Sequence, residues 1–211
     1  MLSRLITTAL VLSSCVWADV VYTSPAAFAA ATVNPTVIGF NGILAPGQTF
    51  AGFNPLLVAG NSFSTPNAAT FVNVTAADFY GPGFTYPADF IVNSSNPGDN
   101  ELDVTLANPT LALALDYGGF NGGGLGTITL SDGTVFLNSS LTGLANTAFV
   151  GFVSTTPITG FTFVATNDAW VALDVITASP VPEPASYWLL GLAVMGLIAR
   201  RSANTRSYLR H

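Results

Sequence analysis

Short stretches of alternating apolar and polar residues recur along the middle of the chain. The clearest is Glu101–Leu106, in which every second residue is Leu or Val, as in a strand with one buried face. Thr127–Leu130 and Thr134–Leu137 alternate in the same way. They flank Ser131-Asp132-Gly133, and an Asp-Gly pair between two such runs is typical of a β-hairpin. The pattern therefore predicts antiparallel strands.

Several other short segments also have the composition of strands. They lie near Thr36–Phe40, Leu56–Phe63, Thr70–Val74, Asp89–Asn93, Thr110–Asp116, Ala148–Val153, Ile158–Ala165 and Trp170–Thr177. About ten short strands separated by turn residues predict an all-β fold, a two-sheet antiparallel sandwich resembling a jelly roll. One short helix is expected before the tail, with Ser24 as N-cap, Pro25 in the first turn and Phe28 facing inward.

Residues 1–18 have the features of a secretory signal peptide. A positive charge at Arg4 precedes an apolar run, and small residues frame Trp17 before Asp19. Cleavage is expected between Ala18 and Asp19. The alternative is a lipobox at Leu12–Cys15, which would make Cys15 a lipidated first residue; otherwise Cys15 is a small apolar residue that is discarded with the leader.

The C-terminal segment predicts a membrane helix behind a stiff linker. Ser179–Pro184 contains three prolines, which hold the backbone extended. Ala185–Ala199 is an uncharged run of 15 residues, about 22 Å as a helix, which is short of the roughly 20 residues that usually span a bilayer. Because Arg200, Arg201 and the tail at 202–211 are basic, the tail is expected in the cytoplasm and the body outside.

Charge is scarce and one-sided. Only 8% of the residues are charged, against about 25% in an average globular protein. The five basic residues are Arg4, Arg200, Arg201, Arg206 and Arg210, so residues 19–180 carry ten acids and no cation. The single His is His211 and the single Cys is Cys15, which excludes thiolate or imidazole chemistry from the body. An acidic body also disfavours nucleic acid and anionic lipid as partners.

Pro182-Glu183-Pro184, the apolar run and Arg200-Arg201 together resemble the PEP-CTERM sorting signal of Gram-negative bacteria, over roughly residues 181–201. The resemblance implies secretory export, an inner-membrane intermediate, and recognition by the membrane enzyme exosortase. Delivery to the cell surface or the extracellular matrix would follow. The chain then divides into a signal peptide (1–18), a β-sandwich (19–180), the sorting signal (181–201) and a basic tail (202–211).

The body is also similar to the β-sandwich bodies that often precede this signal. The similarity rests on Phe40-Asn41-Gly42, on Gly60–Phe63 and on the closing Val171–Val175. Family members commonly have Asp-Asn in that last strand, whereas Val175 follows Asp174 here. The resemblance supports the fold and implies no particular activity.

Asp99, Glu101 and Asp103 form the densest cluster of oxygen ligands in the body. In an extended segment all three carboxylates lie on one face, where a calcium ion would relieve their repulsion. The alternative is a solvated strand whose charge deters aggregation between sheets.

Phe79–Pro87 is the most aromatic loop. Tyr80, Phe84 and Tyr86, with Trp170 from another segment, are candidates for contact with carbohydrate, although most aromatic residues in sandwiches belong to the core. The glycine-rich stretch Tyr117–Gly126 lacks the spacing and the Lys of a phosphate-binding loop, and is interpreted as a connection between two strands.

These features favour a non-enzymatic surface or matrix protein, a structural or adhesive component associated with exopolysaccharide in a biofilm. The alternative is a calcium-dependent carbohydrate-binding module. A more remote alternative is a glycoside hydrolase with paired carboxylates. Residues 19–180 contain no Lys, His or Arg, which are the side chains that usually orient a substrate. No cofactor other than calcium is expected.

Overall fold

The computed structural model describes residues 19–67, 70–77, 79–80, 88–94, 100–119, 123–142, 147–166 and 171–179. They belong to one compact unit, Ala18–Val181. The predicted signal peptide and the predicted C-terminal sorting helix lie outside the described residues. Within those residues, no helix has the length and apolarity needed to cross a membrane.

The described part of the chain forms one helix and twelve strands. They are β1 (Val20–Tyr22), α2 (Pro25–Ala31), β2 (Thr36–Ile38), β3 (Phe50–Phe53), β4 (Leu56–Val58), β5 (Asn61–Ser64), β6 (Phe71–Thr75), β7 (Phe90–Ser94), β8 (Glu101–Gly119), β9 (Leu125–Leu130), β10 (Val135–Asn138), β11 (Ala148–Thr166) and β12 (Val171–Ser179).

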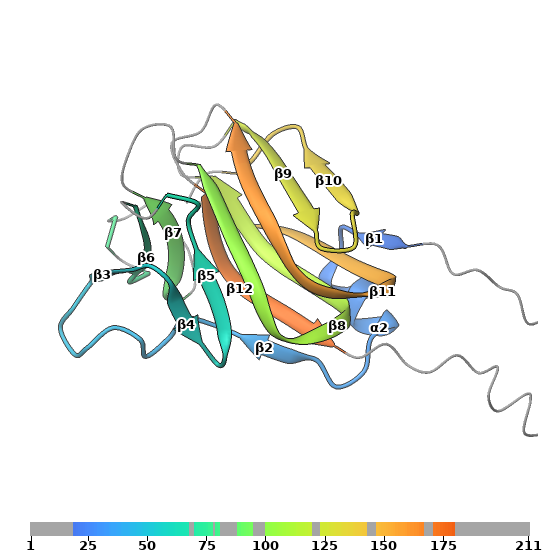
Figure 1. The fold of residues 1–211 in the computed structure, drawn as a ribbon, viewed down its shortest axis with the longest axis horizontal. Helices are drawn as coiled ribbons and strands as arrows, with labels where there is room; N and C mark the ends of the chain where they lie inside the picture. Colours follow the sequence, from blue (N-terminus) through green and yellow to red (C-terminus); the bar gives the residue numbers. More distant parts are fainter. Residues whose placement is uncertain are drawn as a thin grey trace, which may run out of the picture. The chain divides into compact units, whose positions relative to one another are not determined.

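The strands form two antiparallel layers (Figure 1). One layer has the order β10-β9-β11-β8-β5-β4 and uses the second half of β11 and the first half of β8. The other has the order β1-β11-β8-β12, followed by β7, β6 and β3, with β2 beside the end of β12. The predicted all-β, two-sheet antiparallel sandwich is therefore confirmed.

Strands β8 and β11 each belong to both layers, and they pass from one layer to the other together. Val104 pairs with Phe161 in the first layer, and Leu113 pairs with Phe152 in the second, with register shifts between the two regions. The sequence predicts two strands in each of these stretches, which is wrong. Pro109 and Pro157 interrupt the strand pattern. Both strands nevertheless continue beyond them, because pairing resumes at Ile158 with Thr110 and at Gly160 with Thr105 after shifts in register.

The interface between the layers is apolar. The alternation of Glu101–Leu106 is confirmed, since Leu102, Val104 and Leu106 are buried. From the second layer, Leu113, Leu115 and Tyr117 join the same core. The Tyr117 and Phe163 rings meet edge to face with centroids 5.4 Å apart.

The Asp-Gly hairpin is confirmed. β9 and β10 pair in register around Ser131–Thr134, and Gly133 adopts the positive φ of 94° that such a turn requires. By contrast, the single strand expected at Leu56–Phe63 is two strands, β4 and β5, joined at Ala59-Gly60. Both turn residues have positive φ, of 49° and 81°. An Ala at the first of these positions gives no sign of a turn.

The predicted helix is present as α2, and Phe28 is buried beneath it. Ser24 occupies the N-cap position, although its side chain makes no capping hydrogen bond. Phe28 packs on Ala112, Ala114 and Val153, on the face of the second layer that points away from the main core. The helix thus closes a small second core.

Candidate functional site

The acidic residues predicted to bind calcium lie on strand β8 and just before it. Glu101 and Asp103 are both partly exposed and alternate with buried Leu102 and Val104. The Thr162 hydroxyl donates a hydrogen bond of 2.8 Å to Asp103. Asp99 lies outside the described residues. Among the described residues, no group of three His, Cys, Asp or Glu is placed to hold a metal ion, so the three-residue site itself stays a prediction.

Of the residues predicted to contact carbohydrate, the structure describes Tyr80. Phe84, Tyr86 and Trp170 lie outside the described residues. The Tyr80 ring lies 4.9 Å from the Phe79 ring, edge to face, and 6.3 Å from the buried Phe90 ring. Burial raises the pKa of Tyr80 above its ordinary value, partly offset by a hydrogen bond with Thr75. Tyr80 therefore links surface rings to the interior.

Three exposed phenylalanines lie along the edge of the second layer, and we call them the aromatic surface: Phe50, Phe71 and Phe79. Their side chains are 42%, 46% and 42% exposed. The Phe50 and Phe79 rings stack with centroids 5.6 Å apart and an interplanar angle of 24°. Phe71 lies against Gly52, with its Cβ 3.3 Å from where a side chain would begin. Large aromatic groups exposed together commonly mark an interaction site.

The backbone brings Phe50 and Phe79 together and places Phe71 further along the same edge. In the pairing of β3 with β6, Phe50 lies opposite Thr75. Phe71 lies two residues before Asn73 and four before Thr75, on the same face of β6. The Ala76 amide donates to the Thr49 carbonyl at 2.9 Å, and the Phe79 amide donates to the Ala76 carbonyl at 3.0 Å. This turn carries Phe79 back over the start of β3.

Sequence reasoning missed Phe50 and Phe71. It also missed β3, because Phe-Ala-Gly-Phe contains a glycine and shows no apolar alternation. The signal that could have found the site was the proximity of two Phe residues to a Gly in a short segment, which marks close approach of a neighbouring ring.

The pKa values of two aspartates are shifted in opposite directions. Burial raises the pKa of Asp116 on β8 above its ordinary value. At Asp132, burial acts in the same direction but is outweighed by hydrogen bonds from Ser154 and Thr134, which hold the pKa below its usual range. The Thr134 amide donates to Asp132 at 2.8 Å, so this carboxylate closes the hairpin turn.

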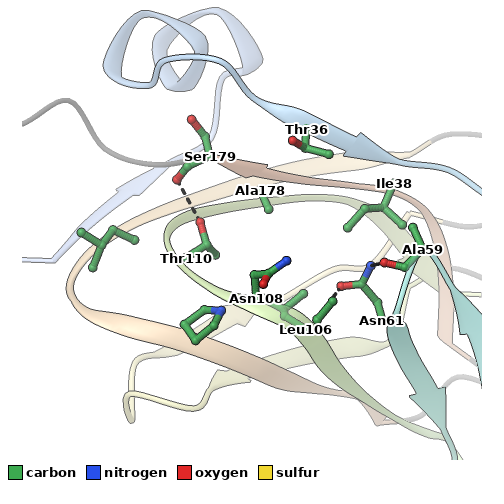
Figure 2. A pocket seen from close by; sticks show the side chains of 12 residues that line it. Thr36, Ile38, Ala59, Asn61, Leu106, Asn108, Thr110, Ala178 and Ser179 are labelled. Atoms are coloured by element: carbon green, nitrogen blue, oxygen red, sulfur yellow. Dashed lines mark hydrogen bonds between the residues drawn. The ribbon is translucent and has the colours of Figure 1, made fainter.

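A cavity of about 450 Å³ opens where β8 bends between the layers (Figure 2). Its walls are the β4–β5 turn at Ala59–Asn61, the bend at Leu106–Leu111, and the ends of β2 and β12. All of its lining side chains are uncharged. A shallower groove of about 380 Å³ lies on the first layer, bordered by Asp103, Thr129 and Thr162 among others.

The end of β12 is fixed beside this cavity. The Thr110 hydroxyl donates to the Ser179 carbonyl at 2.9 Å, and the Ser179 hydroxyl donates to the Val33 carbonyl at 2.5 Å. In the same stretch β12 pairs with β8 on one edge and with β2 on the other. Ala178 lies opposite Leu113 of β8 and opposite Thr36 of β2. The described body is thus held by hydrogen bonds up to Ser179.

The family model of the PEP-CTERM protein-sorting motif matches residues 180–202. This finding agrees with the resemblance at Pro182-Glu183-Pro184 and Arg200-Arg201, all of which lie outside the described residues. The chain carries a PEP-CTERM sorting motif, the mark of an exported protein that is sorted by exosortase. No curated protein sequence matches the chain.

Several solved structures are similar to this chain at low sequence identity. A variant of the family 29 carbohydrate-binding module CBM29-2, complexed with mannohexaose, has a TM-score of 0.40 and 10% identity over 70% of this chain and 92% of that chain. The module CsCBM6-3 from Clostridium stercorarium, in complex with cellobiose, has a TM-score of 0.33 and 15% identity over 64% of this chain and 98% of that chain. The catalytic domain of a GH87 α-1,3-glucanase, in complex with tetrasaccharides, has a TM-score of 0.35 and 12% identity over 71% of this chain and 28% of that chain. Likeness at this level carries no argument about a ligand.

Proposed function

We propose that this exported chain is an adhesive component of the extracellular matrix of a Gram-negative bacterium, and that it binds exopolysaccharide through the aromatic surface. The sorting motif at residues 180–202 supports a role outside the cell. The observation that carries the adhesive role is the exposure of Phe50, Phe71 and Phe79 together on one edge of the sandwich.

The chemistry of this surface suits sugar rings. A pyranose has one face of C–H groups, which can lie on an exposed phenyl ring while its hydroxyls stay hydrated. The stacked pair Phe50–Phe79 is held by the turn at Ala76 and backed by Tyr80, so little conformational freedom is lost when a ligand binds. Rigid exposed aromatic side chains are the typical anchors of binding surfaces.

The charge of the body restricts the polysaccharide. Residues 19–180 contain ten acids and no base, so an acidic polysaccharide would be repelled. Neutral polymers are therefore the preferred ligands.

Calcium is the cation that we propose for Asp99, Glu101 and Asp103. The partly exposed positions of Glu101 and Asp103 on one face of β8 support it, as does the absence of cationic side chains from residues 19–180. Calcium titration of the full chain and of Asp103→Asn, followed by calorimetry and melting temperature, tests it. Heat and a raised melting temperature are expected only for the unchanged chain, and their absence there would contradict the assignment.

Adhesion is tested by affinity electrophoresis of the full chain in detergent, through gels that contain neutral bacterial polysaccharides. The unchanged chain is expected to be retarded. The double variant Phe50→Ala, Phe79→Ala is expected to bind at least about tenfold more weakly, because both stacking faces are lost. The matched control is Leu57→Ala with Val135→Ala, which removes two exposed apolar side chains, 69% and 56% exposed, from other strands.

Equal retardation of both double variants would contradict the proposal, and so would the absence of retardation of the unchanged chain. Analysis of the polysaccharide after incubation adds a separate outcome, since shortened chains would favour the hydrolase.

For sorting, a strain without exosortase is expected to retain the full-length chain in its envelope. Normal release from that strain would contradict the assigned export route.

A further inference from the structure

We propose that the cavity at the bend of β8 is a second binding site, which takes one neutral sugar unit and recognises it through Asn108. The proposal does not depend on adhesion through the aromatic surface, which is built from other strands. A volume of about 450 Å³ falls within the range of roughly 300–1,000 Å³ that is typical of small-molecule sites.

Most polar side chains of the cavity wall are already hydrogen-bonded within the protein. The Asn61 amide donates to the Val58 and Ala59 carbonyls at 3.0 and 3.3 Å, and its side-chain oxygen accepts from the Ala107 amide at 3.0 Å. The Thr110 hydroxyl is shared between the Ala112 and Ser179 carbonyls, each 2.9 Å away. These bonds fix the walls of the cavity and leave little hydrogen-bonding capacity there for a ligand.

Asn108 differs from these wall residues. Figure 2 shows its side-chain amide in the middle of the cavity, between Thr110 and Asn61, with no hydrogen bond to the other residues drawn. It is an exposed residue at the bend, followed directly by Pro109, which restricts its backbone. Asn108 therefore offers the two N–H donors and the carbonyl acceptor of its amide to whatever enters the cavity.

The lining determines the chemical class of the ligand by elimination. No carboxylate lines the cavity, so a cation finds no counter-charge, and no base lines it, so an anion finds none either. A wholly apolar ligand would strip water from the Asn108 amide without replacing its hydrogen bonds, which is unfavourable. A neutral ligand that both donates and accepts hydrogen bonds remains.

A sugar unit meets that description. Two adjacent hydroxyls on a pyranose can accept from the Asn108 N–H groups and donate to its carbonyl at the same time. The apolar side chains of Ile38 and Leu106 and the methyl group of Ala178 border the same space and can face the C–H groups of the ring. The cavity therefore combines a polar anchor with apolar walls, as small-molecule sites commonly do.

Saturation-transfer NMR on the full chain in detergent tests the proposal. The probes are methyl glycosides of glucose, galactose and mannose, with glucuronate and glucosamine as charged counterparts. At least one neutral glycoside is expected to bind, and the charged counterparts more weakly. Asn108→Ala and the nearly isosteric Asn108→Asp are each expected to weaken binding about tenfold, because two or more hydrogen bonds are lost.

Phe79→Ala is the matched control and is expected to leave binding of the monosaccharide unchanged. If the Asn108 variants bind as the unchanged chain does, or if no neutral glycoside binds, the proposal is overturned. If Phe79→Ala abolishes the signal and Asn108→Ala does not, the sugar occupies the aromatic surface, which overturns this proposal and leaves the adhesive function standing.

Discussion

Phe28 fills the space that a side chain at Gly151 would need. A Cβ atom at Gly151 would lie 2.5 Å from the Cδ2 atom of the Phe28 ring. The ring also meets Tyr22 and Phe149 edge to face, with both centroids 6.0 Å away. Helix α2 is therefore seated on β11 through a glycine, and the second core depends on that glycine.

The first prediction concerns Gly151→Ala. The added methyl group must push Phe28 outward, and overpacking of this kind costs about 1–3 kcal/mol of unfolding free energy. Gly39→Ala is the matched control, because nothing lies within 4 Å of the Cβ position there. Urea unfolding of the two variants measures the difference, and equal stability would contradict the packing role of Gly151.

Asp116→Asn is expected to stabilise the protein at neutral pH. Because burial raises the pKa of Asp116 in the folded state, its stabilising contribution is full below the unfolded pKa of about 3.9 and is lost as pH rises through the folded value. The neutral amide avoids that loss. The gain in stability of the variant over the unchanged protein is expected to be larger at pH 7 than at pH 3, and an equal difference at both pH values would contradict the assignment.

Asp132→Asn is expected to act in the opposite direction. Hydrogen bonds from Ser154 and Thr134 lower the folded pKa of Asp132 against the effect of burial, so its contribution is present above about pH 3.9 and lost as pH falls through the folded value. The variant should therefore be less stable at pH 7, with the difference closing towards pH 2. Guanidinium unfolding at both pH values measures this, and a constant difference would argue against a titrating group.

Ala59→Gly is expected to stabilise the β4–β5 turn by about 0.5–1 kcal/mol, because Ala59 has a φ of 49°, which glycine adopts without steric cost. Asn34→Gly is the control, since Asn34 has the same φ of 49° but Asn tolerates this conformation better. Thermal unfolding should show the larger increase for Ala59→Gly. A larger increase for Asn34→Gly would contradict the account of strain.

Local patterns were sufficient for the elements whose register is set by nearby residues. The alternation at Glu101–Leu106, the Asp-Gly turn and the burial of Phe28 each depend on a period or a turn residue that a short window of sequence contains. The continuity of β8 and β11 could not be predicted in this way. Pro109 and Pro157 signal a break locally, and only the pairing of two bent strands keeps each as one element.

The candidate sites also differ in whether a short window of sequence contains their signal. Tyr80 belongs to a loop whose composition drew attention to it, whereas Phe50 lies 29 positions before Phe79 and joins it through the hydrogen bond from Ala76 to Thr49. Asn108 gives no signal in the sequence at all. Its significance depends on Asn61 and Thr110 being hydrogen-bonded elsewhere while its own amide faces the cavity.

The way β12 ends has a mechanical consequence for the segment that follows it in the chain. A pull along β12 from Ser179 would load the ladders to β8 and β2 in shear, so that many bonds must break together instead of opening one after another. Traction applied to the chain beyond Ser179 is therefore borne by the whole strand.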